Sequence, residues 1–579
     1  MTSKNETKLN TNETNQNYTK ENISMIELFS GIGAQKRGID NTELYNLNVI
    51  ATSDVDKEAL VEYAAIHHGL TNEMIENYKD YPSREQMIEE LKERNIGMDF
   101  DKGKMYEWDK LLKKKTKELE KYWLAMTLQN NLGDISKIEQ LPNADCWFYS
   151  SPCQCFSLAG KQDGIDATCN TCGRKYNPMK LDVEHRYICP RCGSDDIKGT
   201  RSGLLLEVER LLIKAIETNT APKYLCLENV KNLVSKKFKT DFDAWVKRLE
   251  YLGYNTYWEV LNAKSCGIPQ NRERVFAFSI RKDIDTEKFT FPIPFDNGLR
   301  LKDVLEKNVD ERYYINTERA ANLIQQLIDK GQLKRQSDSQ GILVKNQATE
   351  VTRPVDMANT LMARDWKGFG NQDMIAIVES EKLIDNAERL GGMFDDKTRH
   401  QAGSVWNVNG MSPTLDTMQG GLRQPCVVEN TALKEKEVDV IGIKQATKKG
   451  YIECELPGCA DLSYPSSTTR RGRVQENGQI CPTITATETG IHYIESVYRI
   501  RKLTPRECFK LMGFEFEDWD KCVELSISNT AGYKAAGNSI VTNCISLLFE
   551  HLYKAQHDNT YICTDEVMQN NVKDNNPSC

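Results

Sequence analysis

A cysteine that directly follows an apolar strand is the residue of this chain best suited to covalent chemistry. Residues 147–149 read Trp-Phe-Tyr, which predicts a buried parallel strand, and two serines and a proline at 150–152 end it. Cys153 then emerges at the carboxyl end of the strand, where open α/β sheets bind ligands. It is either a small buried apolar residue or an activated nucleophile, and the second interpretation requires partner residues elsewhere.

Glu228 and two arginines are candidate partners. Residues 224–227 form an apolar strand that ends on Glu228, and Arg272 and Arg274 precede another apolar run at 275–280. A carboxyl group in a buried site tends to stay protonated and can then donate its proton. Nearby arginines favour the thiolate form of a cysteine. The chain therefore holds a potential thiolate nucleophile and a potential proton donor, each at the end of a strand.

Four further cysteines form two pairs that suit a metal ion. Each pair has two intervening residues, sixteen residues separate the pairs, and a glycine follows each pair, as knuckle turns prefer. Paired thiolates at this spacing fit a tetrahedral structural zinc site, whereas disulfides are the poorer alternative in a reducing compartment. The expected ligands are Cys169, Cys172, Cys189 and Cys192.

A strand, a glycine turn and a later acid predict a site for a nucleoside-type cofactor. Residues 23–29 are apolar and β-inclined, and Gly31 and Gly33 permit a tight turn with close approach of the backbone to a ligand. The next strand, 49–54, ends on Asp54, which is poised for ribose hydroxyls. The full dinucleotide fingerprint is missing, so these residues alone specify no particular cofactor.

The elements that must position these residues predict an α/β fold with a doubly wound, Rossmann-like sheet, because strands and helices alternate along the chain. A later region is rich in Gly, Thr, Asn and Gln and predicts a smaller β-rich domain. The expected divisions are a disordered polar tail 1–22, a catalytic segment 23–315 with a helical insertion 71–130 and a cysteine-rich insertion 166–199, the β-rich domain 316–495, a returning catalytic segment 496–556 and a polar tail 557–579.

Composition sets weaker limits. The chain has 39% apolar and 28% charged residues, as soluble globular proteins do, and no run approaches the roughly 20 apolar residues that span a bilayer. The polar N-terminus lacks the apolar core of a signal peptide, so the 18 cysteines are expected as thiols or metal ligands in a reducing compartment. A net charge of −8 argues mildly against nucleic acid as a partner, but a local basic face would suffice.

Five short motifs, in this order, resemble those of the DNA cytosine-5 methyltransferase family. They are Glu-Leu-Phe-Ser-Gly-Ile-Gly at 27–33, Ser-Pro-Cys-Gln at 151–154, Leu-Glu-Asn-Val at 227–230, Gln-Asn-Arg-Glu-Arg at 270–274 and Ala-Gly-Asn-Ser at 536–539. The resemblance covers most of 23–315 and 496–552 and is thin between them. It implies transfer of a methyl group from S-adenosylmethionine to carbon 5 of cytosine, within a specific short sequence of duplex DNA.

The resemblance also implies roles for individual residues. Cys153 would add to carbon 6 of a cytosine flipped out of the duplex, and Glu228 would protonate its nitrogen 3. Arg274 would hold the exocyclic oxygen, and Arg272 a backbone phosphate or the same oxygen. The β-rich domain would read bases in the major groove. Its candidate base-contact residues are Arg364, Trp366, Lys367, Gln419, Arg423, Gln424 and Thr487.

The cofactor pocket follows from the same resemblance. Phe29 would lie against the adenine, Asp54 would bind the ribose, and Asp134 would face the adenine amine, although Asp134 could equally be a helix N-cap. Val55 departs from the aromatic residue that many relatives carry. The expected pocket consists of Phe29, Ser30, Gly31, Gly33, Asp54, Val55, Asp134, Ile135, Pro152, Leu204, Asn538 and Ser539.

Two alternatives stay open. A tRNA cytosine-5 methyltransferase would share the site, but the large β-rich region favours DNA. A catalytically idle nucleic-acid-binding protein is the other, and the complete set of Cys153, Glu228 and Arg274 argues against it. We expect a cytoplasmic monomer, nucleoid-associated in a bacterium, that contacts duplex DNA and no membrane. Whether a cognate restriction enzyme accompanies it stays open.

Overall fold

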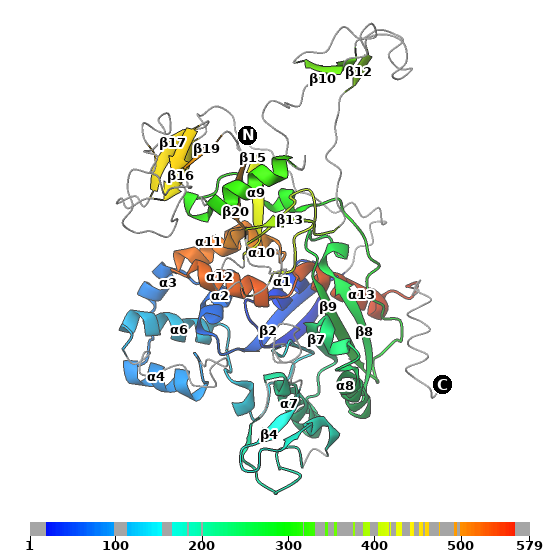
Figure 1. The fold of residues 1–579 in the computed structure, drawn as a ribbon. Helices are drawn as coiled ribbons and strands as arrows, with labels where there is room; N and C mark the ends of the chain where they lie inside the picture. The colour runs from blue at the N-terminus through cyan, green and yellow to red at the C-terminus, as the bar shows by residue number, and fades with distance from the viewer. Residues whose placement is uncertain are drawn as a thin grey trace.

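The structure is a computed structural model, and it describes most of the residues that form the central domain (Figure 1). The long described stretches are 19–97, 113–152, 165–181, 185–198, 201–315 and 498–561. Shorter described pieces are 318–329, 342–345, 352–355, 374–376, 386–393, 403–415, 417, 424–430, 440–444, 451–455, 458–461, 474 and 491–494.

A six-stranded sheet forms the centre of the fold, with strand order β2-β1-β3-β7-β9-β8. The first four strands of this order are parallel, whereas β9 is antiparallel to both of its neighbours, β7 and β8. The α/β prediction is confirmed, and the sheet is mixed because its last two strands along the chain form a hairpin. The strands are β1 Glu21–Leu28, β2 Tyr45–Ser53, β3 Cys146–Tyr149, β7 Tyr224–Val230, β8 Tyr254–Asn262 and β9 Glu273–Arg281.

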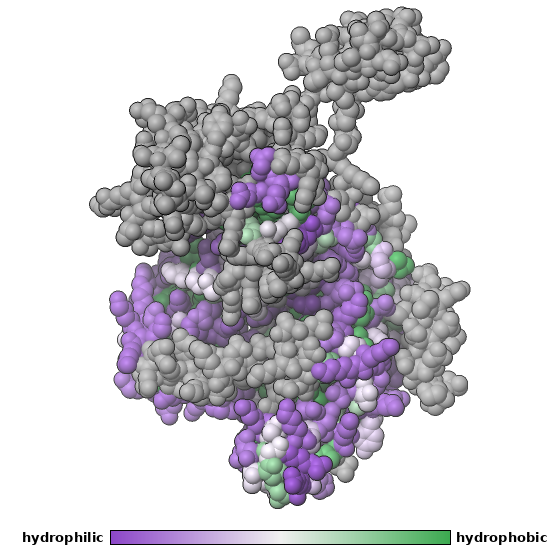
Figure 2. All heavy atoms as spheres, viewed as in Figure 1, coloured by the Kyte–Doolittle hydropathy of each residue, from purple (hydrophilic) through white to green (hydrophobic). Residues whose placement is uncertain are grey.

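Helices cover both faces of this sheet because successive strand residues point to opposite sides. Cys146 and Phe148 of β3 belong to one apolar cluster, whereas Trp147 and Tyr149 belong to the other. The first cluster includes residues of α1 Ala34–Asp40, α2 Lys57–His68 and α13 Thr542–His557, and the second includes residues of α7 Leu205–Glu217 and α8 Lys239–Tyr251. The outer surface is largely hydrophilic, as Figure 2 shows for the described residues of one face.

The end of the chain returns to α1, the helix that follows the first strand. A Cβ added at Gly38 would lie 2.6 Å from the Cβ of Ile545, and the Ser546 hydroxyl donates a hydrogen bond of 2.7 Å to the Gly38 carbonyl. The returning helices are α10 Pro505–Lys510, α11 Phe516–Glu524, α12 Asn529–Asn538 and α13. Thr504 caps α10 and Pro505 opens it, as expected from the sequence.

The helical character of the first insertion agrees with its pattern. Its helices α3 Asn72–Asn77, α4 Arg84–Glu93 and α6 Thr116–Leu128 place Ile75, Leu91 and Leu119 in the same apolar cluster as the strand residues of β1. This insertion therefore enlarges the main core.

The described part of the third region is rich in strands, but its boundary with the returning segment runs through a sheet. Strand β20 pairs with β15, so residues on both sides of 495 share the sheet β13-β14-β15-β20. That sheet consists of β13 Arg389–Gly392, β14 Ser404–Trp406, β15 Cys426–Asn430 and β20 Tyr498–Lys502, and α9 Glu318–Asp329 packs on it. Smaller sheets contain β10 Ile342–Lys345, β11 Thr352–Val355 and β12 Met374–Ala376, the pair β16 Val440–Lys444 and β17 Tyr451–Glu455, and the pair β18 Gly458–Asp461 and β19 Ile491–Ile494.

Candidate active site

The turn after β1 lies at the point where the strand order of the sheet reverses, between β1 and β3. Phe29 adopts a left-handed φ of 60°, and the backbone N–H groups of Phe29 and Ser30 donate to the Ser53 carbonyl at 2.7 and 3.2 Å. The Gly31 N–H donates to Oδ2 of Asp54 at 2.9 Å. The predicted glycine turn and the predicted ribose-binding acid are thus joined directly, at the place where such sheets bind nucleotides.

The groups around this turn fit a nucleoside cofactor. Among the described residues, the buried Oγ of Ser30 has no hydrogen-bond partner, and a Cβ added at Gly31 would meet no atom within 4 Å. Burial raises the pKa of Asp54, and the backbone N–H groups of Gly31 and Asp56, which donate to its two oxygens at 2.9 Å, oppose that rise. Gly33 is needed for a different reason, since its φ is 74° and a Cβ there would lie 2.4 Å from the His67 ring.

Three further predicted pocket residues are Val55, Asp134 and Ile135, of which Asp134 is the one expected to face the adenine amine. Val55 is buried, and Ile135 belongs to the second apolar cluster. Asp134 caps the short 3-10 helix Ile135–Lys137, with Oδ1 accepting from the Ser136 N–H at 3.0 Å, so the N-cap interpretation is confirmed. Its other oxygen, Oδ2, accepts a hydrogen bond of 2.8 Å from the Asn95 amide.

The catalytic end of the site is built where β3 and β7 end side by side. The Asn229 amide donates to the Ser151 carbonyl at 3.1 Å and so ties the end of β7 to the segment that leads to Cys153. Pro152 is described and partly exposed, whereas Cys153 lies outside the described residues, and its position remains a prediction.

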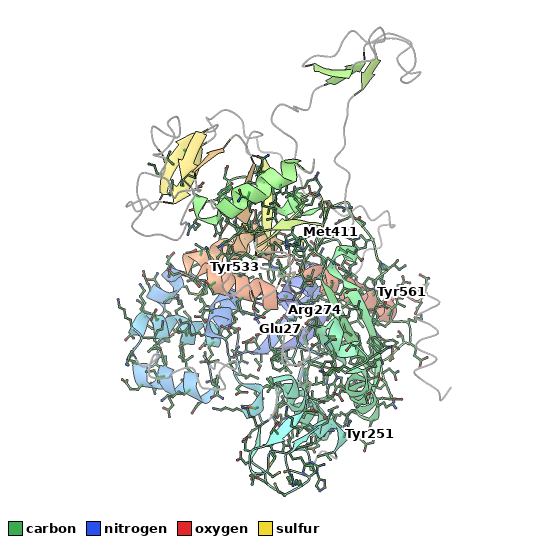
Figure 3. All side chains as sticks on the ribbon, in the orientation of Figure 1. Glu27, Tyr251, Arg274, Met411, Tyr533 and Tyr561 are labelled. Carbon is green, nitrogen blue, oxygen red and sulfur yellow. The ribbon has the colours of Figure 1, made fainter. Side chains whose placement is uncertain are left out.

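Glu228 and Arg274 lie together at this end of the sheet. The Nε atom of Arg274 is 3.2 Å from Oε1 of Glu228, and the glutamate side chain is 9% exposed. Burial raises the pKa of Glu228, while Arg274 and Arg272 oppose that rise. A buried glutamate with a raised pKa can hold the proton that the predicted role requires. Glu27 and Arg274 both lie near the centre of the molecule, whereas Tyr251 of α8 lies at its edge (Figure 3).

Arg272 has a different environment from Arg274. Its side chain is buried, and its guanidinium donates to the carbonyls of Leu415, Gly537 and Ser539 at 2.9, 3.1 and 2.7 Å. It therefore joins the start of β9 to the third region and to the end of α12. This arrangement favours a joining role over the predicted contact with a DNA phosphate, which would require a more exposed guanidinium.

The remaining cofactor candidates lie on elements that meet this site. Phe29 and Leu204 pack against the same apolar cluster, and Ser539 is buried beside the Arg272 guanidinium. Asn538 is exposed at the end of α12. Of the candidate base-contact residues, Gln424 is described and buried, and the others lie outside the described residues.

Two residues near the cofactor turn were not singled out from the sequence. Glu27 of β1 is fully buried, accepts from the Tyr63 hydroxyl at 2.5 Å and from the Lys36 N–H at 2.9 Å, and burial raises its pKa to about 7. Asn95 is the other. An acid inside an apolar strand was a visible signal for Glu27, whereas nothing local marks Asn95.

The four predicted metal ligands converge. Their sulfur atoms all lie within 4.8 Å of one another, and the pairs Cys169–Cys192 and Cys172–Cys189 have Sγ–Sγ distances of 3.6 Å. A tetrahedral site with Zn–S bonds of about 2.3 Å places its sulfurs about 3.8 Å apart. The two knuckles have matching geometry, with φ of 71° at Gly173 and 70° at Gly193.

The cysteine-rich insertion is attached to the catalytic helices by a buried ionic network. Glu209 of α7, whose side chain is 1% exposed, pairs with Arg186 of the insertion and, at 2.5 Å, with Arg248 of α8. The Asn177 amide also donates to Asp241 of α8 at 2.8 Å. The insertion is thus seated on α7 and α8, close to where the segment that begins at Cys153 rejoins the domain.

These features define a class first: a Rossmann-like methyltransferase sheet with a cofactor turn and a glutamate–arginine pair at neighbouring strand ends. The sequence matches the family described as C-5 cytosine-specific DNA methylase over residues 106–172 and 191–554. The chain belongs to this family. The gap in the match, residues 173–190, begins directly after Cys172 and includes Cys189, so it lies within the predicted cysteine-rich insertion 166–199.

Relatives extend along most of the chain. It is 28% identical to the type II methyltransferase M2.ScrFI of Lactococcus lactis subsp. cremoris, over 92% of this chain and 100% of that protein. It is 28% identical to the orphan methyltransferase M.SPBetaI of Bacillus phage SPbeta, over 79% of this chain and 93% of that protein. It is 29% identical to the orphan methyltransferase M.SssI of Spiroplasma monobiae, over 64% and 93%.

The chain is therefore a DNA cytosine-5 methyltransferase that uses S-adenosylmethionine. The expected fold, cofactor and reaction are confirmed, and a tRNA substrate is not favoured. Within the described stretches, no helix is long and apolar enough to span a bilayer.

Proposed function

We propose that the enzyme methylates cytosine within one short sequence of duplex DNA, with Cys153 as the nucleophile. The observation that carries this proposal is the buried Glu228–Arg274 pair at the end of β7, tied by Asn229 to the segment that leads to Cys153. A target base can reach this buried edge only after it has left the duplex, at a cost of a few kcal/mol.

The chemistry follows from the polarity of the ring. The Cys153 thiolate forms a bond to carbon 6, while the protonated Glu228 donates to nitrogen 3 and neutralises the charge that enters the ring. Arg274 holds the exocyclic oxygen and orients Glu228. S-adenosylmethionine would supply the methyl group: as carbon 5 bonds to the methyl carbon, the bond between that carbon and the sulfonium sulfur would break, and S-adenosylhomocysteine would leave. A base or water then removes the carbon 5 proton, and the bond between sulfur and carbon 6 breaks.

The test reads every cytosine of a plasmid by bisulfite sequencing after incubation with S-adenosylmethionine. We expect protection at one short motif and none with Cys153→Ser, which should still bind DNA. Methylation by the Cys153→Ser variant would overturn the nucleophile assignment. Protection of unrelated cytosines without a common motif would overturn the proposed sequence specificity.

The protonated state of Glu228 gives a second test. Because burial raises its pKa above the ordinary value of 4.5, the rate should hold above that pH and fall as pH rises through the raised pKa. Glu228→Gln should slow transfer by a factor of about 10² or more and remove that falling limb, since glutamine cannot donate the same proton. An unchanged rate and profile would exclude Glu228 from the mechanism.

We also propose that the four-cysteine cluster binds one structural zinc ion. The convergent sulfurs and matched knuckles support a closed tetrahedral site, and the seating of the insertion on α7 supports a bracing role. Metal analysis of the purified protein should give about one zinc per chain. Absence of zinc from protein purified without chelators, and failure of the apoprotein to take it up, would contradict this proposal.

The assembly is proposed to be a monomer. Both type II and orphan enzymes occur among its relatives, so these relatives do not decide whether a cognate restriction enzyme accompanies this protein. Light scattering during gel filtration, with and without duplex DNA, would test the monomer.

A further inference from the structure

The helical insertion reaches the predicted adenine side of the cofactor pocket. The Gly97 N–H donates to the Val55 carbonyl at 2.6 Å, and the Asp134 N–H donates to the Arg94 carbonyl at 2.9 Å. A Cβ added at Gly133 would lie 2.1 Å from the same Arg94 carbonyl. The stretch that follows α4 therefore contacts two predicted pocket residues, Val55 and Asp134, through its backbone. The close approach at Gly133 leaves no room for a side chain there.

Asn95 makes the side-chain contact at this junction. It is 7% exposed, its φ is 54°, and its amide donates to Oδ2 of Asp134. Oδ1 of Asp134 already accepts from both the N–H and the hydroxyl of Ser136, at 3.0 and 2.8 Å. A carboxylate has about four acceptor positions, so these three donors leave one of them, on Oδ2, for a ligand. Asn95 thereby fixes the direction in which that free position points.

We propose that the helical insertion forms the adenine wall of the cofactor pocket and that Asn95 is a positioning residue for Asp134. Asp134 would then accept a hydrogen bond from the exocyclic amine of adenine. The inference depends on the proposed cofactor role of Asp134. A neutral amide suits this task because it holds the carboxylate by one hydrogen bond without adding a charge that would compete with the ligand.

The test measures binding of S-adenosylhomocysteine to the free enzyme by calorimetry. Asn95→Gly preserves the left-handed backbone and removes the amide, and Asn95→Asp preserves the shape but places a carboxylate against Asp134. We expect the Kd to rise about tenfold for Asn95→Gly, which is about 1.4 kcal/mol, because one hydrogen bond to the carboxyl group is lost, and to rise more for Asn95→Asp. With saturating S-adenosylmethionine, kcat and the KM for DNA should change less than twofold.

A matched control separates positioning from folding. Asn130 also has a positive φ, of 46°, and its amide donates to the Ile50 carbonyl at an exposed site. Asn130→Gly should leave the Kd unchanged. The thermal midpoints of both glycine variants should agree within a few degrees, so that a loss of affinity is not a loss of structure.

A ligand analogue separates this inference from the proposed cofactor site. S-inosylhomocysteine replaces the adenine amine with a carbonyl oxygen and so removes the donor. The wild type should bind it at least tenfold more weakly than S-adenosylhomocysteine, and Asn95→Gly should reduce that preference. Failure of the wild type to bind S-adenosylhomocysteine would overturn the cofactor assignment itself. Normal binding with an undiminished preference in Asn95→Gly would overturn only the role of Asn95.

Discussion

The two insertions join the catalytic domain in different ways. The helical insertion shares its apolar side chains with the main core, so the same cluster contains Ile75, Leu119 and strand residues of β1. The cysteine-rich insertion is small, and it is held by four converging thiols and by the buried network at Glu209. A segment of about 30 residues cannot bury enough apolar surface to fold alone, so it needs a cross-link of its own.

The insertions also reach opposite sides of the reaction. The helical insertion contacts Val55 and Asp134 on the cofactor side. The cysteine-rich insertion interrupts the segment between Cys153 and α7, on the side of the nucleophile. Figure 1 shows the helical insertion near α2 and the cysteine-rich insertion, which contains β4 Ala167–Cys169, beside α7. Substitutions that disrupt the helical insertion should therefore affect cofactor binding, and substitutions that disrupt the cysteine-rich insertion should affect turnover.

Loss of one of the four proposed zinc ligands should have the largest effect. Cys189→Ser should abolish zinc binding and unfold the insertion, because structural zinc contributes an apparent 10–16 kcal/mol in small domains. Methyl transfer should fall at least tenfold, while the Kd for S-adenosylhomocysteine stays the same. Metal analysis, limited proteolysis and initial rates would measure this. Thr171→Ala, within a knuckle but not a ligand, is the control. Full turnover without zinc would show that the insertion does not brace the catalytic segment.

Removal of the negative charge of Glu209, which lies between Arg186 and Arg248, should have the second-largest effect. Glu209→Gln leaves two arginines without their carboxylate, and breaking a buried pair costs about 3–5 kcal/mol. Urea unfolding would give the free energy of unfolding. Glu217→Gln breaks a pair with Lys214 on the surface of the same helix, where about 0–1 kcal/mol is expected. Equal losses in the two variants would mean that the network does not anchor the insertion.

A cavity in the helical insertion should destabilise the whole domain. Leu119→Ala removes a fully buried side chain from the shared core, at about 2–5 kcal/mol. Zinc content should not change. Lys117→Ala, on the same helix as Leu119, removes an exposed ion pair with Glu76 of α3 and should leave the free energy of unfolding nearly unchanged. If proteolysis of Leu119→Ala cut only the insertion while the remaining domain unfolded as in the wild type, the shared-core interpretation would fail.

The contrast between the insertions also separates what a sequence reveals from what it hides. The cysteine spacing predicted that the four thiols converge, because two short C-x2-C turns place their sulfurs at fixed positions. Asp54 and Glu228 were equally visible, since each follows an apolar run and strand ends meet at one edge of the sheet, although β7 continues past Glu228 to Val230. The family motifs then added the reaction, which no periodicity could supply.

Contacts between distant segments were not visible. Asn95 and Asp134 are separated by 39 positions, and the Arg272 guanidinium reaches carbonyls more than 140 positions away. Every residue has a backbone carbonyl, so a hydrogen bond to a carbonyl requires no particular residue type in the partner segment and leaves no pattern in its sequence. The predicted role for Arg272 came from its motif alone, and the structure favours a joining role. The reversed direction of β9 was also hidden, because an apolar run does not specify parallel or antiparallel pairing.

The smallest expected effect concerns Glu27, which links the cofactor turn to α2, the helix on which the helical insertion packs. An acid whose pKa rises from 4.5 to about 7 on folding binds its proton more tightly in the native state. The native state is therefore favoured below about pH 4.5, and this contribution is lost as pH rises to about 7. Glutamine removes the charge: its amide oxygen can accept from the Lys36 N–H, and its amide nitrogen would donate to the Tyr63 hydroxyl oxygen instead of accepting from it. Between these pH values, the wild type should lose about 1–3 kcal/mol of stability relative to Glu27→Gln.

Urea unfolding at several pH values would measure that difference, with Glu73→Gln on exposed α3 as the control. The cysteine-rich insertion does not belong to the apolar cluster that contains β1 and the helical insertion. The stability of Cys189→Ser should therefore change over the same pH range as that of the wild type. A difference between Glu27→Gln and the wild type that stayed constant with pH would mean that Glu27 is already ionised in the folded protein. A window that moved on zinc loss would mean that the two insertions are coupled through the sheet, contrary to their separate attachment.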